Sequence, residues 1–250
     1  MARLSRYFLP DQPLHIIQRG NNRSAIFFAP DDHALFRLWL GEAAAAQGCA
    51  IHAYVLMTNH FHLVATPRRA DGLPRMMQSL GRRYVQHVNR TQRRTGTLWE
   101  GRYRATPIDA EAYFFACCRY VEENPVRAGM VAAPADHSWS SYRRNALGAA
   151  DPLVVEHALY TALGADAAQR SAGYRALFRP LDEATLTAIR AATNKGWALG
   201  DDDFRARVTA QTGRRAERLP AGRKRQIASS DGQSDRVTPP HPSEIRKMRV

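Results

Sequence analysis

The chain has 250 residues, of which 44% are hydrophobic, and a formal net charge of +13. This length can bury one substantial core with a smaller appendage, and the charge favours a polyanionic partner, first nucleic acid and then an anionic membrane surface. No apolar run approaches the roughly 18 residues that cross a bilayer, and the N-terminus reaches Pro10 before a signal-peptide core can form. Two of the three cysteines are adjacent in the sequence and make a poor disulfide pair. We therefore expect a cytoplasmic protein with no membrane partner.

The first expected strand, residues 14–19, ends in a polar turn. Arg19 at the end of the strand, and Asn22 and Arg23 in the turn, are candidate contacts for DNA phosphates. The same three residues would also suit a turn that is merely solvated. An amphipathic helix is expected next, over residues 30–48.

Two further strands are expected at 51–57 and 60–66. On the second of them His60 and His62 are two residues apart, so both imidazoles project from one face. Neutral imidazole is a common ligand of divalent cations, and this pair suits a single metal ion. The alternative is two polar residues on the solvent side of a half-buried strand. Simple alternation in the first of the two strands predicts one face with Ile51, Ala53, Val55 and Met57 and an opposite face with His52, Tyr54 and Leu56.

A basic amphipathic helix is expected over residues 73–88, and a strand within 97–108 whose outer face places arginines beside Tyr103. Cationic side chains mixed with an aromatic ring favour single-stranded nucleic acid. An ordinary edge strand, protected from aggregation by its charges, is the alternative. The DNA-binding candidates in this part of the chain are Arg82, Arg83, Arg102 and Arg104.

The next helix is expected to start at Asp109 and to stop at Asn124 and Pro125. The order β, α, β, β, α, β, α predicts an α+β fold, a ferredoxin-like antiparallel sheet with helices on one face. Tyr120 and Asn124 are four residues apart and share a face of this helix. If that face covers the histidine strand, the Asn124 carboxamide oxygen would be a third metal ligand. The Tyr120 phenol would then lie beside the ion as a nucleophile.

Other interpretations of Tyr120 remain open from the residues alone. It would also suit a core aromatic ring with its hydroxyl at the rim. Tyr113, seven residues earlier on a similar face, is the main rival nucleophile. Tyr84 and Tyr103 are weaker rivals because neither has an amide ligand four residues later.

A combination of short motifs identifies a family that the chain resembles. The motifs are 19–23 (RGNNR), 54–63 (YVLMTNHFHL), 98–103 (LWEGRY), 119–129 (RYVEENPVRAG) and 139–142 (WSSY). With them the chain resembles the single-tyrosine HUH transposases over residues 10–147, and within this IS200-like superfamily the REP-associated tyrosine transposases.

This resemblance implies the HUH endonuclease fold. It also implies a Mg²⁺- or Mn²⁺-dependent endonuclease and strand transferase that acts on single-stranded DNA with REP-like hairpins. His60 and His62 would be metal ligands, Asn124 the third ligand, and Tyr120 the nucleophile that forms a 5′-phosphotyrosine. Related enzymes supply the tyrosine either within one chain or between two, so a monomer and a homodimer remain open. The place of action would be the nucleoid.

We expect a transposase domain at 1–147, a helical C-terminal extension at 148–213, and a disordered basic tail at 214–250. The extension has helical periodicity over 152–163, 167–178 and 183–192. It is either a small DNA-binding appendage or packing that covers the sheet. In the tail, residues 222–225 carry a basic run that would sit in a DNA groove or simply be solvated.

Two other function classes compete with the transposase. The first is a non-catalytic module that binds structured single strands and represses a gene. The second is a zinc hydrolase built on His60, His62 and a cysteine such as Cys117, which lacks a general-base glutamate near the histidines.

Overall fold

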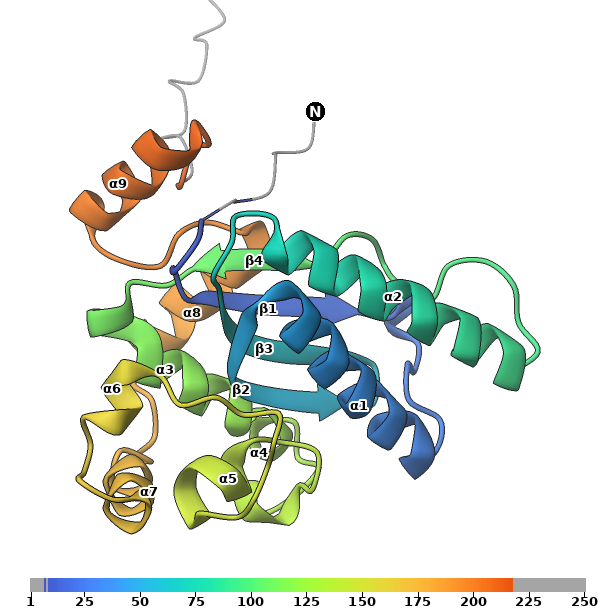
Figure 1. Ribbon diagram of the computed structural model, residues 1–250, viewed down its shortest axis with the longest axis horizontal. Helices are drawn as coiled ribbons and strands as arrows, with labels where there is room; N and C mark the ends of the chain where they lie inside the picture. Colours follow the sequence, from blue (N-terminus) through green and yellow to red (C-terminus); the bar gives the residue numbers. More distant parts are fainter. Residues whose placement is uncertain (1–6, 8, 218–250) are drawn as a thin grey trace, which may run out of the picture. The chain divides into compact units, whose positions relative to one another are not determined.

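The structure of this protein is a computed structural model that describes residue 7 and residues 9–217. Its centre is a four-stranded antiparallel sheet in the order β2-β3-β1-β4 (Figure 1). The strands are β1 (Leu14–Arg19), β2 (Cys49–Met57), β3 (His60–Pro67) and β4 (Arg104–Pro107). The α-helices are α1 (Pro30–Gln47), α2 (Gly72–Thr91), α3 (Ala110–Glu122), α4 (Asn124–Arg127), α5 (Tyr142–Leu147), α6 (Ala158–Thr161), α7 (Ala167–Ala176), α8 (Glu183–Lys195) and α9 (Asp202–Thr212). Short 3₁₀ turns lie at η1 (Asn21–Arg23) and η2 (Pro134–Asp136).

Helices α1 and α2 cover one face of the sheet (Figure 1). The Asp32 carboxylate caps the start of α1, since it accepts hydrogen bonds from the backbone N–H groups of Phe28 and Ala29. Gly48, at φ 64°, ends the same helix. Helix α2 buries a stripe at helical spacing, Met76, Leu80, Tyr84 and Val88. These helices pack on the sheet residues Ile16, Leu56, Phe61 and Leu63 in one apolar cluster.

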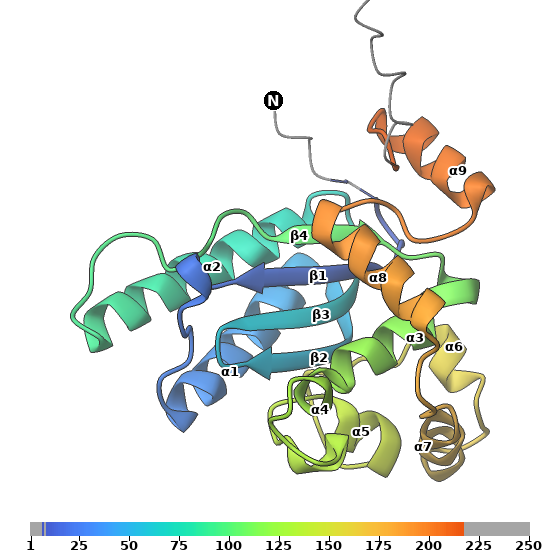
Figure 2. The same cartoon turned by 180° about the vertical axis from the view of Figure 1, so that it is seen from behind.

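The opposite face, which we call the histidine face because His60 and His62 lie on it, is also covered. Figure 2 shows α3 beside β2, and α8 crossing β1 and β4. The α+β class and the antiparallel sheet are confirmed. The expectation that helices cover one face holds for α1 and α2 only, because α3 and α8 cover the other face. The physical reason is that alternation leaves apolar side chains on the histidine face, and these also need burial. They are Ala53, Val55, Met57 and Val64.

A β-bulge changes the expected alternation in β2. Ile51 pairs with Ala65 and Ala53 with Val64, so the register shifts by one residue between them. As a result Ile51 packs in the α1 and α2 cluster, whereas His52 makes a ring contact with Phe114 of α3. The predicted faces are therefore wrong for Ile51 and His52 and hold from Ala53 onward.

The strand expected within 97–108 is shorter in the structure. It is confined to β4, because Gly101 at φ 155° interrupts the extended backbone. Upstream, Trp99 forms an isolated bridge with Gly20 at the end of β1. Arg102 therefore precedes the strand rather than lying on its outer face.

The C-terminal helices are part of the same compact unit as the sheet. The helices expected at 167–178 and 183–192 are found as α7 and α8. The helix expected at 152–163 is wrong in its first half, where the Val155 N–H donates to the Ile51 carbonyl (2.7 Å) and extends the sheet edge. Helix α8 packs on β1 and β4, which fits the packing alternative for this segment.

The start of the predicted basic tail is packed. The Arg214 guanidinium donates to the Gly196 carbonyl and lies 3.7 Å from the centre of the Tyr7 ring. Ala216 is fully buried. The prediction of a disordered tail is thus wrong for 214–217, and residues 218–250, with the basic run at 222–225, lie outside the described residues.

Within the described ranges, no helix combines the length and apolar character that crossing a membrane requires. The three cysteines, Cys49, Cys117 and Cys118, are buried and free.

Candidate active site

The paired histidines lie at the middle of the sheet, on β3. His60 faces Arg19 across the β1–β3 ladder and His62 faces Ile17. Their ring centroids are 5.1 Å apart, with planes at 78°. His62 is 2% exposed and His60 is half-buried. The two imidazoles therefore converge on one face, as strand alternation requires.

The tautomer of His60 follows from its neighbour in the β2–β3 turn. The Asn59 amide nitrogen donates to the Arg23 carbonyl (2.9 Å), so the Asn59 Oδ1 atom faces His60 Nδ1 at 2.7 Å. Because Oδ1 only accepts hydrogen bonds, Nδ1 carries the proton. The remaining nitrogen, Nε2, keeps a lone pair that can bind a metal ion.

A third histidine, His15 on β1, lies against His62. The two rings are joined by a hydrogen bond of 2.8 Å between His15 Nε2 and His62 Nδ1, and they lie within 21° of parallel. The other nitrogen of His15 is 3.0 Å from the Thr193 hydroxyl on α8. His62 thus has its Nδ1 occupied, which leaves Nε2 as the ring nitrogen without a hydrogen bond within the described residues.

Burial keeps these histidines neutral. It lowers the pKa of His15 to about 3 and that of His60 to about 4, and it holds the pKa of His62 well below its ordinary value. The charges of Arg19 and Arg127 lower the pKa of His62 further. Neutral imidazoles are the form that coordinates metal ions, so the face is ready for coordination at physiological pH.

Tyr120 of α3 lies directly over the histidines. Its ring centroid is 5.9 Å from that of His62 and 5.7 Å from that of His15. The Arg127 guanidinium stacks on the same ring at 4.3 Å, donates to the Tyr120 carbonyl, and pairs with Glu123 at 3.3 Å. Within the described residues, the ring of the rival Tyr113 makes no contact with the rings of these histidines.

A buried carboxyl fixes the end of α3 on which Tyr120 sits. Glu122 is fully buried and accepts hydrogen bonds from Ser141 (2.5 Å), Asn145 (2.9 Å) and Tyr174 (2.8 Å). Burial raises the pKa of Glu122 to about 7. Side chains at the start of α5, within α5 and within α7 thereby hold the end of α3 in place.

Asn124 starts α4, and one residue, Glu123, separates it from the end of α3 at Glu122. Its backbone carbonyl accepts from the Ala128 N–H (2.9 Å), so Asn124 stays within a helical turn despite Pro125. Its side chain is half-buried and makes no hydrogen bond within the described residues. Asn124 and Tyr120 therefore lie on two successive helices rather than on one helix as the spacing predicted, and the Asn124 carboxamide oxygen is available as a ligand.

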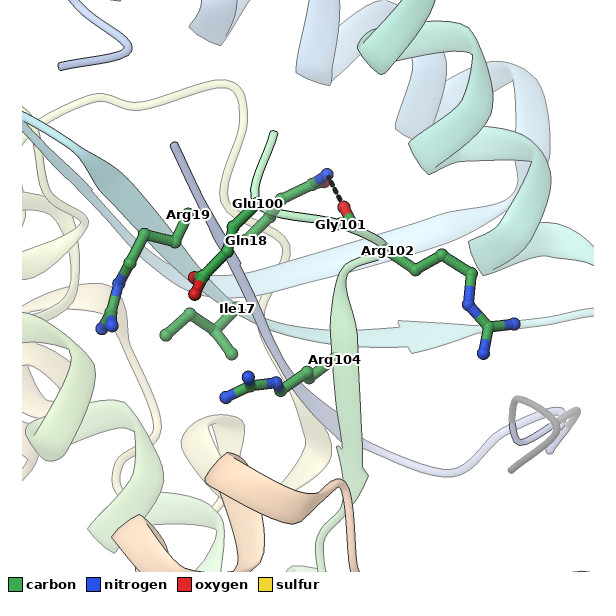
Figure 3. Close-up of a pocket in the computed structure, with 7 residues that line it drawn as sticks. All are labelled: Ile17, Gln18, Arg19, Glu100, Gly101, Arg102 and Arg104. Carbon is green, nitrogen blue, oxygen red and sulfur yellow. Dashed lines mark hydrogen bonds between the residues drawn. The ribbon is translucent and has the colours of Figure 1, made fainter. Parts of the chain in front are cut away.

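The arginine candidates divide into groups. One pocket is lined by Ile17, Gln18, Arg19, Glu100, Gly101, Arg102 and Arg104 (Figure 3). Figure 3 shows Arg19 and Arg104 on either side of Ile17, whereas the Arg102 side chain extends away from them. Ile17 pairs with both His62 and Arg104 across neighbouring ladders, so this cationic pair flanks the histidine face.

The remaining candidates lie elsewhere. Arg82 and Arg102 line a second, shallow groove along α2 that has Trp99 in its wall. Asn22 and Arg23 are exposed in the turn after β1. Arg83 pairs with Glu42 of α1 and lies 4.7 Å from the Trp39 ring centre, so the structure does not bring it to the histidine face.

Sequence reasoning missed His15, Arg127 and Thr193. His15 could have been found, because it alternates with Ile17 and Arg19 on a strand that pairs with the histidine strand. Arg127 follows Tyr120 by seven residues, a helical repeat. No sequence signal pointed to Thr193. As for the zinc alternative, Cys117 is fully buried in the apolar core, and within the described ranges no three His, Cys, Asp or Glu side chains gather in a metal-binding group.

Comparisons with known proteins relate this chain to transposases. The model of the family described as IS200-like transposase matches residues 10–124, which include both histidines, Tyr120 and Asn124. A solved REP-associated tyrosine transposase bound to a REP hairpin is 17% identical, with a TM-score of 0.52 over 63% of this chain and 93% of that one. A putative transposase from Deinococcus radiodurans R1 is 19% identical, with a TM-score of 0.35 over 50% of this chain and 97% of that one. The search of curated proteins gave no match. Residues 10–124 are therefore similar to the IS200-like transposase family, and the chain shares the fold of the REP-associated enzyme.

Proposed function

We propose that this protein is a transposase that cuts and rejoins single-stranded, hairpin-containing DNA at a divalent metal site through a tyrosine–DNA covalent intermediate. The observation that carries the proposal is the position of Tyr120, whose ring lies 5.9 Å from that of His62 and beneath the Arg127 guanidinium. A phenol, two neutral imidazoles and a partly buried guanidinium on one face of the sheet suit phosphoryl transfer.

The residues fit a bound Mg²⁺ or Mn²⁺ ion. His60 and His62 would hold it through their Nε2 atoms, since both Nδ1 atoms are already hydrogen-bonded. Asn124 would add its carboxamide oxygen, a hard donor suited to these ions. When bound, the ion polarises the scissile phosphate and offsets the negative charge that develops on it.

Tyr120 would act as the nucleophile. Its phenolic oxygen attacks the phosphorus, the bond from phosphorus to the 3′ oxygen breaks, the phenol loses its proton, and the departing oxygen gains one. The 5′ phosphate is then held on Tyr120 as a diester, so its energy remains available for rejoining by another 3′ hydroxyl. Arg127 would stabilise the phenolate and keep the ring in place.

The cations around the histidine face would position the strand. Arg19 pairs with His60 across the β1–β3 ladder and Arg104 lines the same pocket as Arg19, so both would contact phosphates that flank the cut. Arg82 and Arg102 would continue this track, with Trp99 as a stacking surface. The REP hairpin bound by the similar solved enzyme supports hairpin DNA as the substrate class. Such an enzyme would work at the nucleoid.

The test is a covalent-adduct assay with hairpin oligonucleotides taken from the flanks of the gene. In the presence of Mn²⁺, a label at the 3′ end of the DNA should remain with the protein, whereas a label at the 5′ end should leave with a free 3′ hydroxyl. Tyr120→Phe should lower the rate of adduct formation by a factor of about 10³ or more, while hairpin binding persists. Tyr113→Phe is the matched control and should retain the adduct.

Two outcomes would overturn the assignment. An adduct that survives in Tyr120→Phe and disappears in Tyr113→Phe would move the nucleophile. Tight, metal-independent hairpin binding without cleavage of any substrate would instead make the chain a non-catalytic binder, such as a repressor.

A further inference from the structure

Three buried side chains form a hydrogen-bonded row that ends on His62. Thr193 of α8 contacts His15 Nδ1 at 3.0 Å, and His15 Nε2 contacts His62 Nδ1 at 2.8 Å. Thr193 is 4% exposed, His15 0% and His62 2%. The row is therefore shielded from bulk water, and His15 is the partner of both Thr193 and His62.

The direction of the hydrogen bonds in this row decides which nitrogen of His62 is free. If the Thr193 hydroxyl donates, His15 Nε2 must carry the proton and donate to His62 Nδ1. The proton of neutral His62 then sits on Nε2, which blocks coordination there. If the hydroxyl accepts from His15 Nδ1, His15 Nε2 accepts from His62 Nδ1, and His62 Nε2 has a free lone pair.

The row connects the sheet to the C-terminal helices. Helix α8 crosses β1 and β4 on the histidine face, and it also contacts α3, which carries Tyr120 (Figure 2). Thr193 lies 69 residues beyond position 124, the last that the transposase family model matches. The hydroxyl thus reaches the site from a part of the chain that the family comparison leaves without a role.

We infer that His15 and Thr193 are positioning residues that hold His62 with its Nε2 atom free for the metal ion, so that α8 is a structural part of the metal site. This inference rests on the proposed function, because it assigns the two residues to the metal site proposed there. Partners of this kind, which bind the far nitrogen of a ligating histidine, fix its tautomer and orientation.

Thr193 offers a sharp pair of variants. Thr193→Val keeps the shape of the side chain but replaces the accepting hydroxyl with a methyl group, whereas Thr193→Ser keeps the hydroxyl. In the full chain, Mn²⁺ binding measured by titration calorimetry should weaken about tenfold in Thr193→Val and less than about twofold in Thr193→Ser. His60→Ala should abolish the same binding.

A second measurement needs no variant. In ¹⁵N-histidine spectra of the Mg²⁺-bound full chain, His62 should carry its proton on Nδ1, and His15 should do the same. A His62 that is protonated on Nε2 in the presence of Mg²⁺ would overturn the inference, whether or not Thr193→Val folds.

The outcomes separate the two proposals. Thr193→Val that binds Mn²⁺ as tightly as the wild type would overturn the role of the row and leave the proposed function intact. Wild-type protein that binds no Mn²⁺, or binds it equally well in His60→Ala, would refute the proposed metal site and this inference with it. A tenfold loss in the valine variant that serine restores would support both.

Discussion

The two faces of the sheet have different tasks. Beneath α1 and α2, the sheet presents large apolar side chains such as Phe61 and Leu63, which are fully buried. On the opposite face the neighbours of these residues along β3 are His60 and His62, and a tyrosine and an arginine lie over them. One strand thus supplies both a core and a candidate catalytic centre, through alternate residues.

The difference teaches how the site is supported. The apolar face gains free energy from burial and holds the strands in register. The histidine face loses some of that gain, because its buried polar groups need partners. These partners come from distant segments, including Thr193 of α8 and Ser141, whose hydroxyl reaches the buried Glu122. Stability and chemistry should therefore respond differently to substitutions on the two faces.

The largest expected effect comes from substituting Phe61 and His60, one at a time, with alanine. Phe61→Ala should lower the free energy of unfolding by about 3–5 kcal/mol, because a fully buried ring leaves a cavity. His60→Ala, one residue earlier and half-buried, should cost less than about 1 kcal/mol yet abolish Mn²⁺ binding. Urea unfolding and calorimetry on the same proteins check both. Equal stability losses in the two variants would contradict the division between faces.

The next effect is a pH dependence on the histidine side, at His52. This ring contacts the Val155 carbonyl at 2.8 Å and the Thr66 hydroxyl at 3.0 Å, and burial lowers its pKa to about 4. Between the unfolded pKa near 6.5 and the folded value, the unfolded chain binds the proton and the folded chain does not, so stability falls as pH falls. Urea unfolding at pH 6.5 and pH 5 should show wild type losing about 1–2 kcal/mol more than His52→Gln. A loss that is the same in both proteins would exclude His52 as its source.

Sequence patterns predicted much of the fold, because local periodicity decides it. Alternation in 60–66 and helical spacing in 73–88 were sufficient for β3 and α2. The errors have local causes that periodicity does not report, namely a bulge between Ile51 and Ala53 and a glycine at φ 155° before β4. The sequence prediction also placed helices on one face only, and it did not take into account the apolar residues on the histidine face that a second helical layer buries.

A smaller effect is expected at Arg127, whose guanidinium lies 4.3 Å from the Tyr120 ring centre. Arg127→Met removes the charge but keeps most of the length of the side chain, so the rate of adduct formation should fall about tenfold. Arg119→Met is the control, since Arg119 lies next to Tyr120 on α3 but donates to the Arg179 carbonyl instead. Single-turnover kinetics measure both rates, and equal rates in the two variants would remove Arg127 from the site.

The smallest effect concerns DNA affinity. Arg104→Ala should weaken hairpin binding about three- to fivefold and reduce the salt dependence of binding by about one ion, because one phosphate contact is lost. Arg83→Ala should bind like wild type, since Arg83 is engaged by Glu42 and Trp39. Fluorescence anisotropy at several salt concentrations tests the pair. The opposite order of effects would place the DNA along α1 rather than along the histidine face.

The candidate site was only partly accessible from the sequence. His60, His62, Tyr120 and Asn124 lie in short motifs whose spacing carries their geometry. Thr193 could not be found in this way, because its contact with His15 spans 178 residues and depends on how α8 crosses the sheet. Which arginines reach the histidine face also depended on tertiary packing, because Arg104 is placed by its pairing with Ile17 whereas Arg83 on α2 pairs with Glu42 of α1.

The central claim is spatial: the two imidazoles and the phenol surround one ion. Anomalous diffraction from crystals of the full chain soaked in Mn²⁺ tests it most directly. We predict a single strong peak within bonding distance of His60 Nε2 and His62 Nε2, adjacent to the Tyr120 hydroxyl and the Asn124 carboxamide. A peak ligated through Nδ1 of either histidine, or one remote from Tyr120, would contradict it.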